Sequence, residues 1–442
     1  MFYIAKNTEL DAKLLKKMID RFYIYDQPRL DRYKNYYDGL QAILAKSYTD
    51  PTKPCNRTVI NYCKNIVDSY AGYMAAPGHI SYRSEQDIED IMNILRYNDY
   101  QTEDANFLLD ALVYGRANEL MYLDSTSQVR FRLINPRQCF GVYDDSLTSD
   151  LLYFVRFYKA NMWDDSDLYN VDVYSDYTIK HYTMTGMSGF LTFISEEPHH
   201  FGQCPANIFM LPDEKNIFDC IISLQDSVNE LLSGEIDDYS AFCDAYLALE
   251  GADAEEEDIV AMKENRVMLL PMGSKAYWIT KNANDTQVEN ILKRAHDAIY
   301  RIAQCPDFSS ETFVGGVSSG VAIQYRLTGM ETRASVIEGS MKMALQRRIE
   351  IISGIATLKL GEAIFRDIQI EFKRNIPADH TATVALVNAL KGTVSDATLL
   401  GQLDFISDVN AELEQLQAEK QANMALYSFG PTFEEDEDNE EE

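Results

Sequence analysis

Residues 318–358 read SSGVAIQYRLTGMETRASVIEGSMKMALQRRIEIISGIATL, and this stretch decides the architecture around it. Its apolar side chains recur at spacings of three and four, which predicts a single amphipathic helix. At 1.5 Å of rise per residue the helix is about 60 Å long, which is unusual for a compact domain. Gly329 and Gly339 are the places where we expect it to bend. The positions in register are Met330, Ala334, Ile337, Met341, Leu345, Ile349 and Ile352.

The segment before the long helix has a different composition. Residues 305–317 contain Pro306, Gly315 and Gly316, which predict a linker. Upstream of the linker, one amphipathic helix runs from about Asn216 towards Leu249, with a break or bend near Gly234 and Asp237-Asp238. A second helix, capped by Asp285, extends to about residue 304. Between these helices we predict a small αββ insertion, with a helix to about Asn265 and strands at 267–270 and 276–280.

The first 215 residues mix helices with short alternating strands, which predicts an α+β fold. Residues 23–48 form a tyrosine-rich polar stretch, to which neither a helix nor a strand is assigned, and the breaker segment 50–54 follows it. Ser84 is expected to cap a helix that starts near Glu85, and Gly115 to end another. The expected helices are 8–22, 56–76, 85–95 and 102–114. The expected strands are 79–82, 117–123, 129–134, 151–158, 169–174, 178–183 and 189–194.

The C-terminal part predicts a strand, 368–372, and then a helical cluster at 379–390, 396–400 and 405–421. The chain has 40 Lys and Arg against 70 Asp and Glu, a formal net charge of −30. Eight of the last nine residues, Glu434 to Glu442, are acidic, and we expect this tail to be disordered. A conventional DNA-binding protein is not expected, because such affinity rests on Lys and Arg. A protein that lets DNA slide past an acidic wall remains compatible with this charge.

Cysteine usage and hydropathy exclude several classes of protein. The seven cysteines are scattered and never form C-x-x-C, which argues against a disulfide framework and a zinc site. No apolar run is long enough to span a membrane, and Met1 to Asp11 do not resemble a signal peptide. We therefore expect a cytoplasmic protein with no membrane association.

Several short features have a functional and a structural interpretation. Gly315-Gly316 lacks the GK[ST] ending of a phosphate loop, so a flexible linker is favoured. The pairs Asp144-Asp145 and Asp237-Asp238 suit metal-dependent hydrolysis only if further carboxylates converge on them, and His199-His200 lacks a third ligand. Solvated turns and a loop are the favoured interpretations. The tyrosines Tyr33, Tyr36 and Tyr37 are interpreted as subunit packing in preference to base stacking.

A series of short motifs, in a fixed order over about residues 55 to 400, resembles the phage portal protein family. The first are Asn61, Ile66-Val67-Asp68, Gly72-Tyr73, Pro77 and Tyr82. The next are Tyr114-Gly115-Arg116-Ala117, Glu119, Tyr122, Asn135-Pro136 and Tyr143-Asp144. The last are Cys305-Pro306-Asp307, Ser319-Gly320-Val321-Ala322, Arg347-Arg348, Asn375-Ile376-Pro377 and Val394-Ser395.

The resemblance implies a portal-type architecture. It assigns 1–215 to a wing of N-terminal helices plus an antiparallel β-rich unit. The stem helices would be 216–250 and 285–304, the clip 251–284, and the tunnel loop 305–317. A long wing helix and strand, 318–375, would precede the crown helices, 376–425, and the acidic tail, 426–442. The tunnel-loop residues expected to line the DNA channel are Asp307, Ser309, Ser310, Glu311, Thr312, Phe313 and Val314.

The implied function is a structural one, without a catalytic residue, cofactor or metal. Copies of the chain would form a ring, a dodecamer by resemblance, at one capsid vertex, through which double-stranded DNA is packaged and ejected. The expected partners are the terminase large subunit, major capsid and scaffold proteins, and a head-to-tail adaptor. The protein would reside in the virion, and in the host cytoplasm during assembly. The alternatives are a minor capsid or adaptor protein and an acidic metal-dependent hydrolase.

Overall fold

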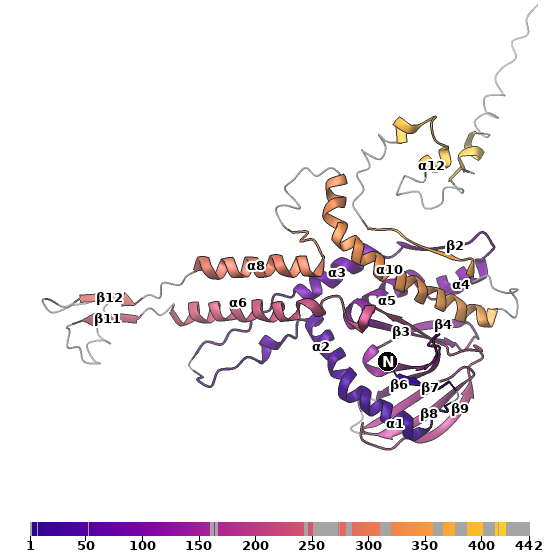
Figure 1. The fold of residues 1–442 in the computed structure, drawn as a ribbon, viewed down its shortest axis with the longest axis horizontal. Coiled ribbons are helices and arrows are strands. Elements are labelled where there is room, and N and C mark those ends of the chain that lie inside the picture. Colours follow the sequence, from indigo (N-terminus) through magenta and orange to yellow (C-terminus); the bar gives the residue numbers. More distant parts are fainter. Residues whose placement is uncertain are drawn as a thin grey trace, which may run out of the picture. The chain divides into compact units, whose positions relative to one another are not determined.

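The computed structural model describes most of the chain and divides it into two units, residues 1–316 with 325–375 and residues 317–324 with 376–442. The described residues are 2–6, 8–51, 53–159, 163, 167–242, 246–250, 273, 275–279, 285–309, 320–356, 366–375, 387–400, 412, 413 and 415–420. Both helices and sheets are present, so the predicted α+β class is confirmed (Figure 1).

The first helices of the first unit form a helical arm. Helix α1 (Ala12–Arg21), a π-helical turn (Phe22–Asp26) and helix α2 (Gln27–Asp38) follow one another without a break in helical backbone geometry. Asp11 caps α1 by accepting a hydrogen bond from the Leu14 N–H, and Gly39 ends α2 in the left-handed conformation. The stretch 23–48, to which no helix was assigned from the sequence, is helical over residues 23–38. Its polar tyrosines lie on a helix whose buried side holds Leu30, Tyr33 and Tyr36.

Two sheets form the β-structure of this unit. The larger has the order β1 (Phe2–Ile4), β5 (Cys139–Asp144), β6 (Leu151–Lys159), β7 (Leu168–Tyr174), β8 (Thr178–Thr185), β9 (Thr192–Pro198), antiparallel except for the β1–β5 pair. The smaller has the order β10 (Ala206–Met210), β3 (Arg116–Leu123), β4 (Val129–Ile134). The sequence missed β1, β5 and β10. A further pair joins β2 (Ile80–Arg83) to β13 (Gln369–Phe372).

Helices α4 (Glu89–Tyr97) and α5 (Tyr100–Tyr114) pack against the smaller sheet, and helix α3 (Tyr62–Ala75) packs against α5. Residues 56–61, expected to be helical, precede α3 in an extended form. Ser84 does not cap α4, whose N-cap is Ile88; its hydroxyl accepts from the Gln86 N–H instead. The arm contacts the larger sheet through Phe22, whose ring lies 5.5 Å from those of Phe140 and Phe157. These buried aromatic contacts fix the arm to the sheet.

Helix α5 ends at Gly115, as predicted. Its φ of +81° is a backbone conformation that favours glycine. Its carbonyl accepts from the Leu211 N–H at 2.9 Å, and a Cβ at this position would lie 2.5 Å from the Glu214 carbonyl oxygen. The backbone at Glu214 and Lys215 lies so close to position 115 that only glycine fits.

Helices α6 (Ile222–Phe242) and α8 (Asp285–Ala303) lie side by side (Figure 1). Helix α6 starts later than predicted and runs through Gly234 without a break. Residues 246–249 were predicted to be helical, but strand β11 (Tyr246–Glu250) occupies this segment and pairs with β12 (Lys275–Ile279). The predicted strand at 276–280 is confirmed by β12, whereas the predicted insertion helix to Asn265 and strand 267–270 lie outside the described residues.

The long helix predicted from residues 318–358 is α10 (Gly320–Ala356), continuous through Gly329 and Gly339. Its buried side carries the predicted stripe, with Met330, Ala334, Met341, Leu345 and Ile349 all fully buried. In the second unit, the described part comprises helical residues 387–390, α12 (Asp396–Leu400) and helical residues 412, 413 and 415–420. The acidic tail lies outside the described residues.

Candidate functional site

The predicted tunnel loop starts where α8 ends. Of the residues expected to face DNA, Asp307 and Ser309 are described, and Ser310, Glu311, Thr312, Phe313 and Val314 lie outside the described residues. Gln304 closes the helix in the left-handed region, with a φ of +53°. The Tyr70 hydroxyl donates to the carbonyls of Ala303 and Gln304 at 3.1 and 3.0 Å, and Arg333 donates to Ala303 at 3.1 Å. These bonds satisfy carbonyls that a helix end leaves open, so α3 and α10 fix the base of the loop.

Asp307 is held by its own loop and by α8. One carboxylate oxygen accepts the backbone N–H and hydroxyl of Ser309 at 3.0 and 2.6 Å. The other lies 3.1 Å from Nε2 of His296, and Nδ1 of the same ring lies 3.1 Å from the Tyr62 hydroxyl. Because a carboxylate only accepts, the ring proton sits on Nε2 and Tyr62 donates to Nδ1 when His296 is neutral.

The electrostatics of this cluster favour an ionised Asp307. Burial opposes the charge, but the bonds from Ser309 and His296 outweigh it and lower the pKa of Asp307 below its ordinary value. Burial and the Asp307 charge raise the pKa of Tyr62 above its ordinary value, and the same causes raise that of Tyr300. Tyr62 and Tyr300 are therefore neutral, and Asp307 is ionised. Sequence reasoning missed His296 and Tyr62, which lie 234 residues apart in the chain.

Near its C-terminal end, α10 carries a fully buried cation. Arg348 Nε donates to Glu119 of β3 at 2.9 Å, and Nη1 donates to Asp104 of α5. The Tyr82 hydroxyl donates to Asp104 at 2.7 Å, and Asn207 donates to Glu119 at 3.2 Å. All three charged side chains are at most 1% exposed. This cluster joins α10 to the smaller sheet, and a buried charge of this kind is tolerated only when it is paired.

The buried cluster explains the structural role of three of the motifs on which the resemblance was based. Tyr82, Glu119 and Arg348 belong to three separate motifs and meet in one hydrogen-bonded group. Burial disfavours the charge on Arg348, but the neighbouring carboxylates outweigh it and raise its pKa above the ordinary value. The Arg348 guanidinium also lies 4.6 Å from the ring centroid of Phe131. These motif residues therefore join α10 to α5, β2 and β3.

Helix α6 binds the extended segment 56–61 and the first residue of α3 through a series of hydrogen bonds, which we call the polar ladder. Backbone N–H groups of alternate residues in the segment donate to side chains that are four residues apart on α6, at 2.5 to 3.0 Å. Two residues of an extended strand advance by about as much as four residues of a helix, so the two spacings match. The donor and acceptor pairs are Asn56 with Asp237, Thr58 with Ser233, Ile60 with Asn229, and Tyr62 with Gln225.

The last rung of the ladder is charged. Asp237 accepts from Lys46 at 2.8 Å and from both the backbone and the side chain of Asn56. Burial opposes its charge, but these bonds prevail and lower the pKa of Asp237 to about 2. The interpretation of Asp237-Asp238 as a solvated turn was wrong, because Asp237 is 6% exposed and sits inside a helix.

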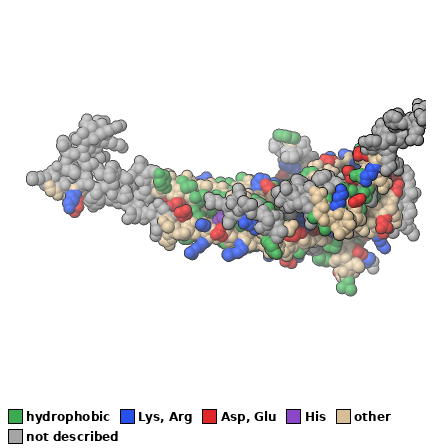
Figure 2. Space-filling model, turned by 90° about the horizontal axis from the view of Figure 1, so that it is seen from above, with side chains coloured by type: hydrophobic (Ala, Val, Ile, Leu, Met, Phe, Trp, Pro, Cys, Tyr) green, Lys and Arg blue, Asp and Glu red, His purple; other side chains and the backbone are tan. Residues whose placement is uncertain are grey.

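The other pairs considered for metal binding are engaged locally. Asp144 accepts from the Ser146 hydroxyl and the Asp150 N–H, and His199 lies 2.9 Å from the Ser175 carbonyl. Within the part of the chain that the structure describes, no group of three or more His, Cys, Asp or Glu residues is arranged to hold a metal ion. None of the helices in that part has the length and apolar character needed to cross a membrane. On the face shown in Figure 2, acidic and basic side chains are interspersed.

In this structure, long helices are joined to sheets by buried polar groups. Comparison with known proteins shows the class of protein to which this chain belongs. The profile of the family described as "Phage portal protein, SPP1 Gp6-like" matches residues 17–425, so the chain belongs to the phage portal protein family. The chain is similar to the portal protein of Bacillus phage SPP1, with 21% identity over 452 aligned residues that cover 93% of this chain and 87% of that protein. The resemblance read from the short motifs is confirmed.

Proposed function

We propose that copies of this chain assemble into a closed ring at one vertex of a phage capsid, and that double-stranded DNA enters and leaves through its channel. The observation that carries the proposal is the match to the portal family over residues 17–425, nearly the whole chain. A ring requires contacts between two different faces of the subunit, which close on themselves by rotation. A dodecamer is the proposed subunit number.

The described elements support a division into the parts of a portal subunit. We assign the wing to residues 1–215, together with α10 and β13 in 318–375. The stem comprises α6 and α8, in 216–250 and 285–304, which lie side by side. The clip, 251–284, includes β12, which pairs with β11 at the end of the first stem segment. Residues 376–425 form the crown, and 426–442 form the tail.

The proposed mechanism is passive guidance of DNA. Helix α6 contains five acidic residues, of which Asp237 is buried and paired with Lys46, and no Lys or Arg. A channel wall built from its other acidic residues repels phosphates and offers no point of strong attachment. The tunnel loop, from Asp307 and Ser309 through Ser310, Glu311, Thr312, Phe313 and Val314, contacts the duplex. The Asp307–His296–Tyr62 contacts described above hold the first residues of this loop in place.

The ring works with other phage proteins. We assign the terminase large subunit, and later the head-to-tail adaptor, to the clip side, and the major capsid and scaffold proteins to the wing and crown. The portal family is structural, and we propose neither a catalytic residue nor a cofactor. The protein is a component of the virion, and it is made in the host cytoplasm.

The test is negative-stain electron microscopy of the purified chain, with its mass measured in solution. The sample is prepared alone and from cells that also produce the phage shell and scaffold proteins. We expect rings with a central hole wide enough for a DNA duplex. A chain that stays monomeric in both preparations contradicts the proposal, as does turnover of a nucleic acid or glycan in the presence of magnesium.

A further inference from the structure

The helical arm, from Ala12 to Asp38, leaves one of its sides uncovered. The exposed positions 13, 17, 21, 24, 25, 28, 32 and 35 follow one another at spacings of at most four, so they form a continuous stripe. We call this stripe the basic ridge. It is defined by Lys13, Lys17, Arg21, Ile24, Tyr25 and Arg32.

The ridge is basic on a protein that is strongly acidic. Residues 12–38 hold seven Lys and Arg against four Asp and Glu, whereas the whole chain holds 40 against 70. Lys13, Lys17 and Arg21 are exposed and form no ion pair or hydrogen bond with any described residue. Several lysines that lie off the ridge pair with carboxylates, namely Lys6, Lys16, Lys34, Lys46 and Lys64. The ridge therefore presents cations whose counter-charges the described part of the chain does not supply.

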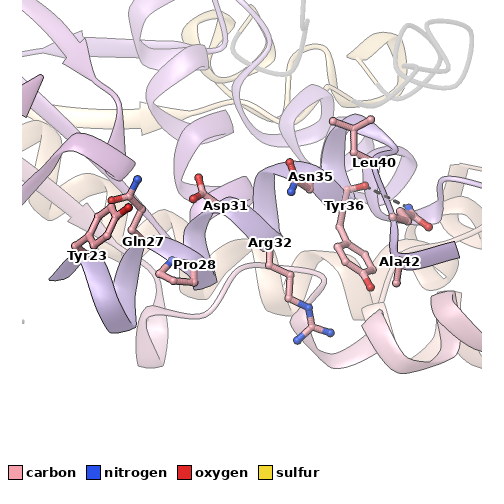
Figure 3. A pocket seen from close by; sticks show the side chains of 10 residues that line it. Tyr23, Gln27, Pro28, Asp31, Arg32, Asn35, Tyr36, Leu40 and Ala42 are labelled. Atoms are coloured by element: carbon pink, nitrogen blue, oxygen red, sulfur yellow. Dashed lines mark hydrogen bonds between the residues drawn. The ribbon is translucent and has the colours of Figure 1, made fainter. Parts of the chain in front are cut away.

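The middle of the ridge is apolar. Tyr25 is 70% exposed and Ile24 is 61% exposed, because the π-helical turn inserts an extra residue and turns three consecutive side chains outward. Beside them lies an open groove of about 670 Å³, lined among others by Tyr23, Arg32 and Leu40 (Figure 3). Exposed aromatic residues and arginine are the side chains that protein–protein interfaces favour.

We propose that the basic ridge and its groove bind an acidic face of a second copy of this chain. The inference rests on the proposed ring and names one of its two contact faces. Subunits that each carry a formal charge of −30 repel one another unless their contact faces are complementary. The ridge supplies unpaired positive charge together with exposed apolar area, and the rest of the same chain supplies an excess of carboxylates.

The experiment compares the wild type with two triple variants of equal charge change. The ridge variant is Lys13→Glu, Lys17→Glu and Arg21→Glu; the control variant is Arg96→Glu, Lys373→Glu and Lys391→Glu, at exposed positions off the ridge. Circular dichroism and thermal melting establish that all three chains fold. We expect the wild type and the control to assemble into rings, and the fraction of the ridge variant in rings to fall at least tenfold.

Mixing the chains adds a second readout. The ridge variant keeps the acidic face, so it binds the ridge of a wild-type copy but offers no ridge to the next one. An equal mixture is therefore expected to give short open oligomers in place of rings. A carbodiimide, which joins amines to carboxylates in contact, is expected to link Lys13 or Lys17 to acidic residues of another copy. Copies labelled with different isotopes distinguish these links from links within one chain.

The outcomes separate this inference from the proposed function. Rings of the ridge variant at wild-type yield refute the ridge as a subunit contact and leave the ring intact. Loss of an acidic scaffold protein or of nucleic acid from otherwise normal rings assigns the ridge to that partner, which also refutes the inference. A wild type that never forms rings contradicts the proposed function itself.

Discussion

Replacing Arg348 by methionine tests the buried cluster that joins α10 to the smaller sheet. The substitution keeps much of the side-chain volume but leaves the carboxylates of Asp104 and Glu119 buried without their cation. Removing one partner of a buried ion pair costs about 3–5 kcal/mol, mostly because the remaining charge is uncompensated. If the free energy of unfolding falls by about 3 kcal/mol per molar urea, this loss lowers the urea midpoint of unfolding by about 1–2 M.

Arg347 provides a matched control on the preceding residue. Its side chain is 32% exposed and bonds Gln203 at 2.7 Å and Glu350 at 2.9 Å. An exposed pair contributes at most about 1 kcal/mol, so Arg347→Met is expected to change the midpoint little. Urea unfolding followed by circular dichroism compares the two variants. Equal midpoints for Arg347→Met and Arg348→Met would show that the cluster does not stabilise the fold as argued.

The same variant has a defined rescue. Substituting both carboxylates as well, with Asp104→Asn and Glu119→Gln, removes the two uncompensated buried charges and is expected to restore part of the lost stability in urea unfolding. A triple variant no more stable than Arg348→Met would show that the unpaired carboxylates are not the cause of the loss.

Three further perturbations test other parts of the structure. Asp237→Asn removes a charged acceptor of the polar ladder. Because the pKa of Asp237 in the folded state is about 2, its contribution to wild-type stability is present above pH 4 and is lost as pH falls from about 4 to about 2. Protease cleavage within residues 42–61 measures this loss. His296→Ala removes the contact that holds Asp307, so chymotrypsin is expected to cleave after Phe308 several times faster than in the wild type. The control His200→Ala, at an exposed loop position, is expected to leave this rate unchanged. Gly115→Ala is expected to cost about 1–3 kcal/mol more than Gly78→Ala in urea unfolding, because both have positive φ but only Gly115 lacks room for a Cβ. Equal costs for the two glycines would remove the close approach to Glu214 as the cause.

The parts of the fold that the sequence predicted are those with long, regular apolar periodicity. The stripe of α10 specified one continuous helix, and the alternation in β3, β4, β6, β7 and β8 specified their strands. The arm over residues 23–38 was missed because its exposed side carries tyrosines and charges, so its apolar period is weak. Strand β1 has three residues, too few for alternation to be distinct.

The candidate site was less accessible to sequence reasoning. Asp307 was identified from its motif, but its partners His296 and Tyr62 come from helices whose relative placement is set by tertiary packing. The four acceptors of the polar ladder recur every fourth residue on α6, a period that was visible, yet their partners are backbone groups that carry no sequence signal. Asp237 was interpreted as part of a turn because its desolvation is balanced by residues nearly 200 positions away.

The polar ladder also determines how freely the extended segment and helix α6 can each change during evolution. At positions 58 and 60 the donor is a main-chain N–H, which every amino acid except proline provides. The facing acceptors, Ser233 and Asn229, are side chains, and few replacements keep an oxygen at the same place. Mutations can therefore accumulate on the extended segment at little cost, while the helix opposite it must keep its residues.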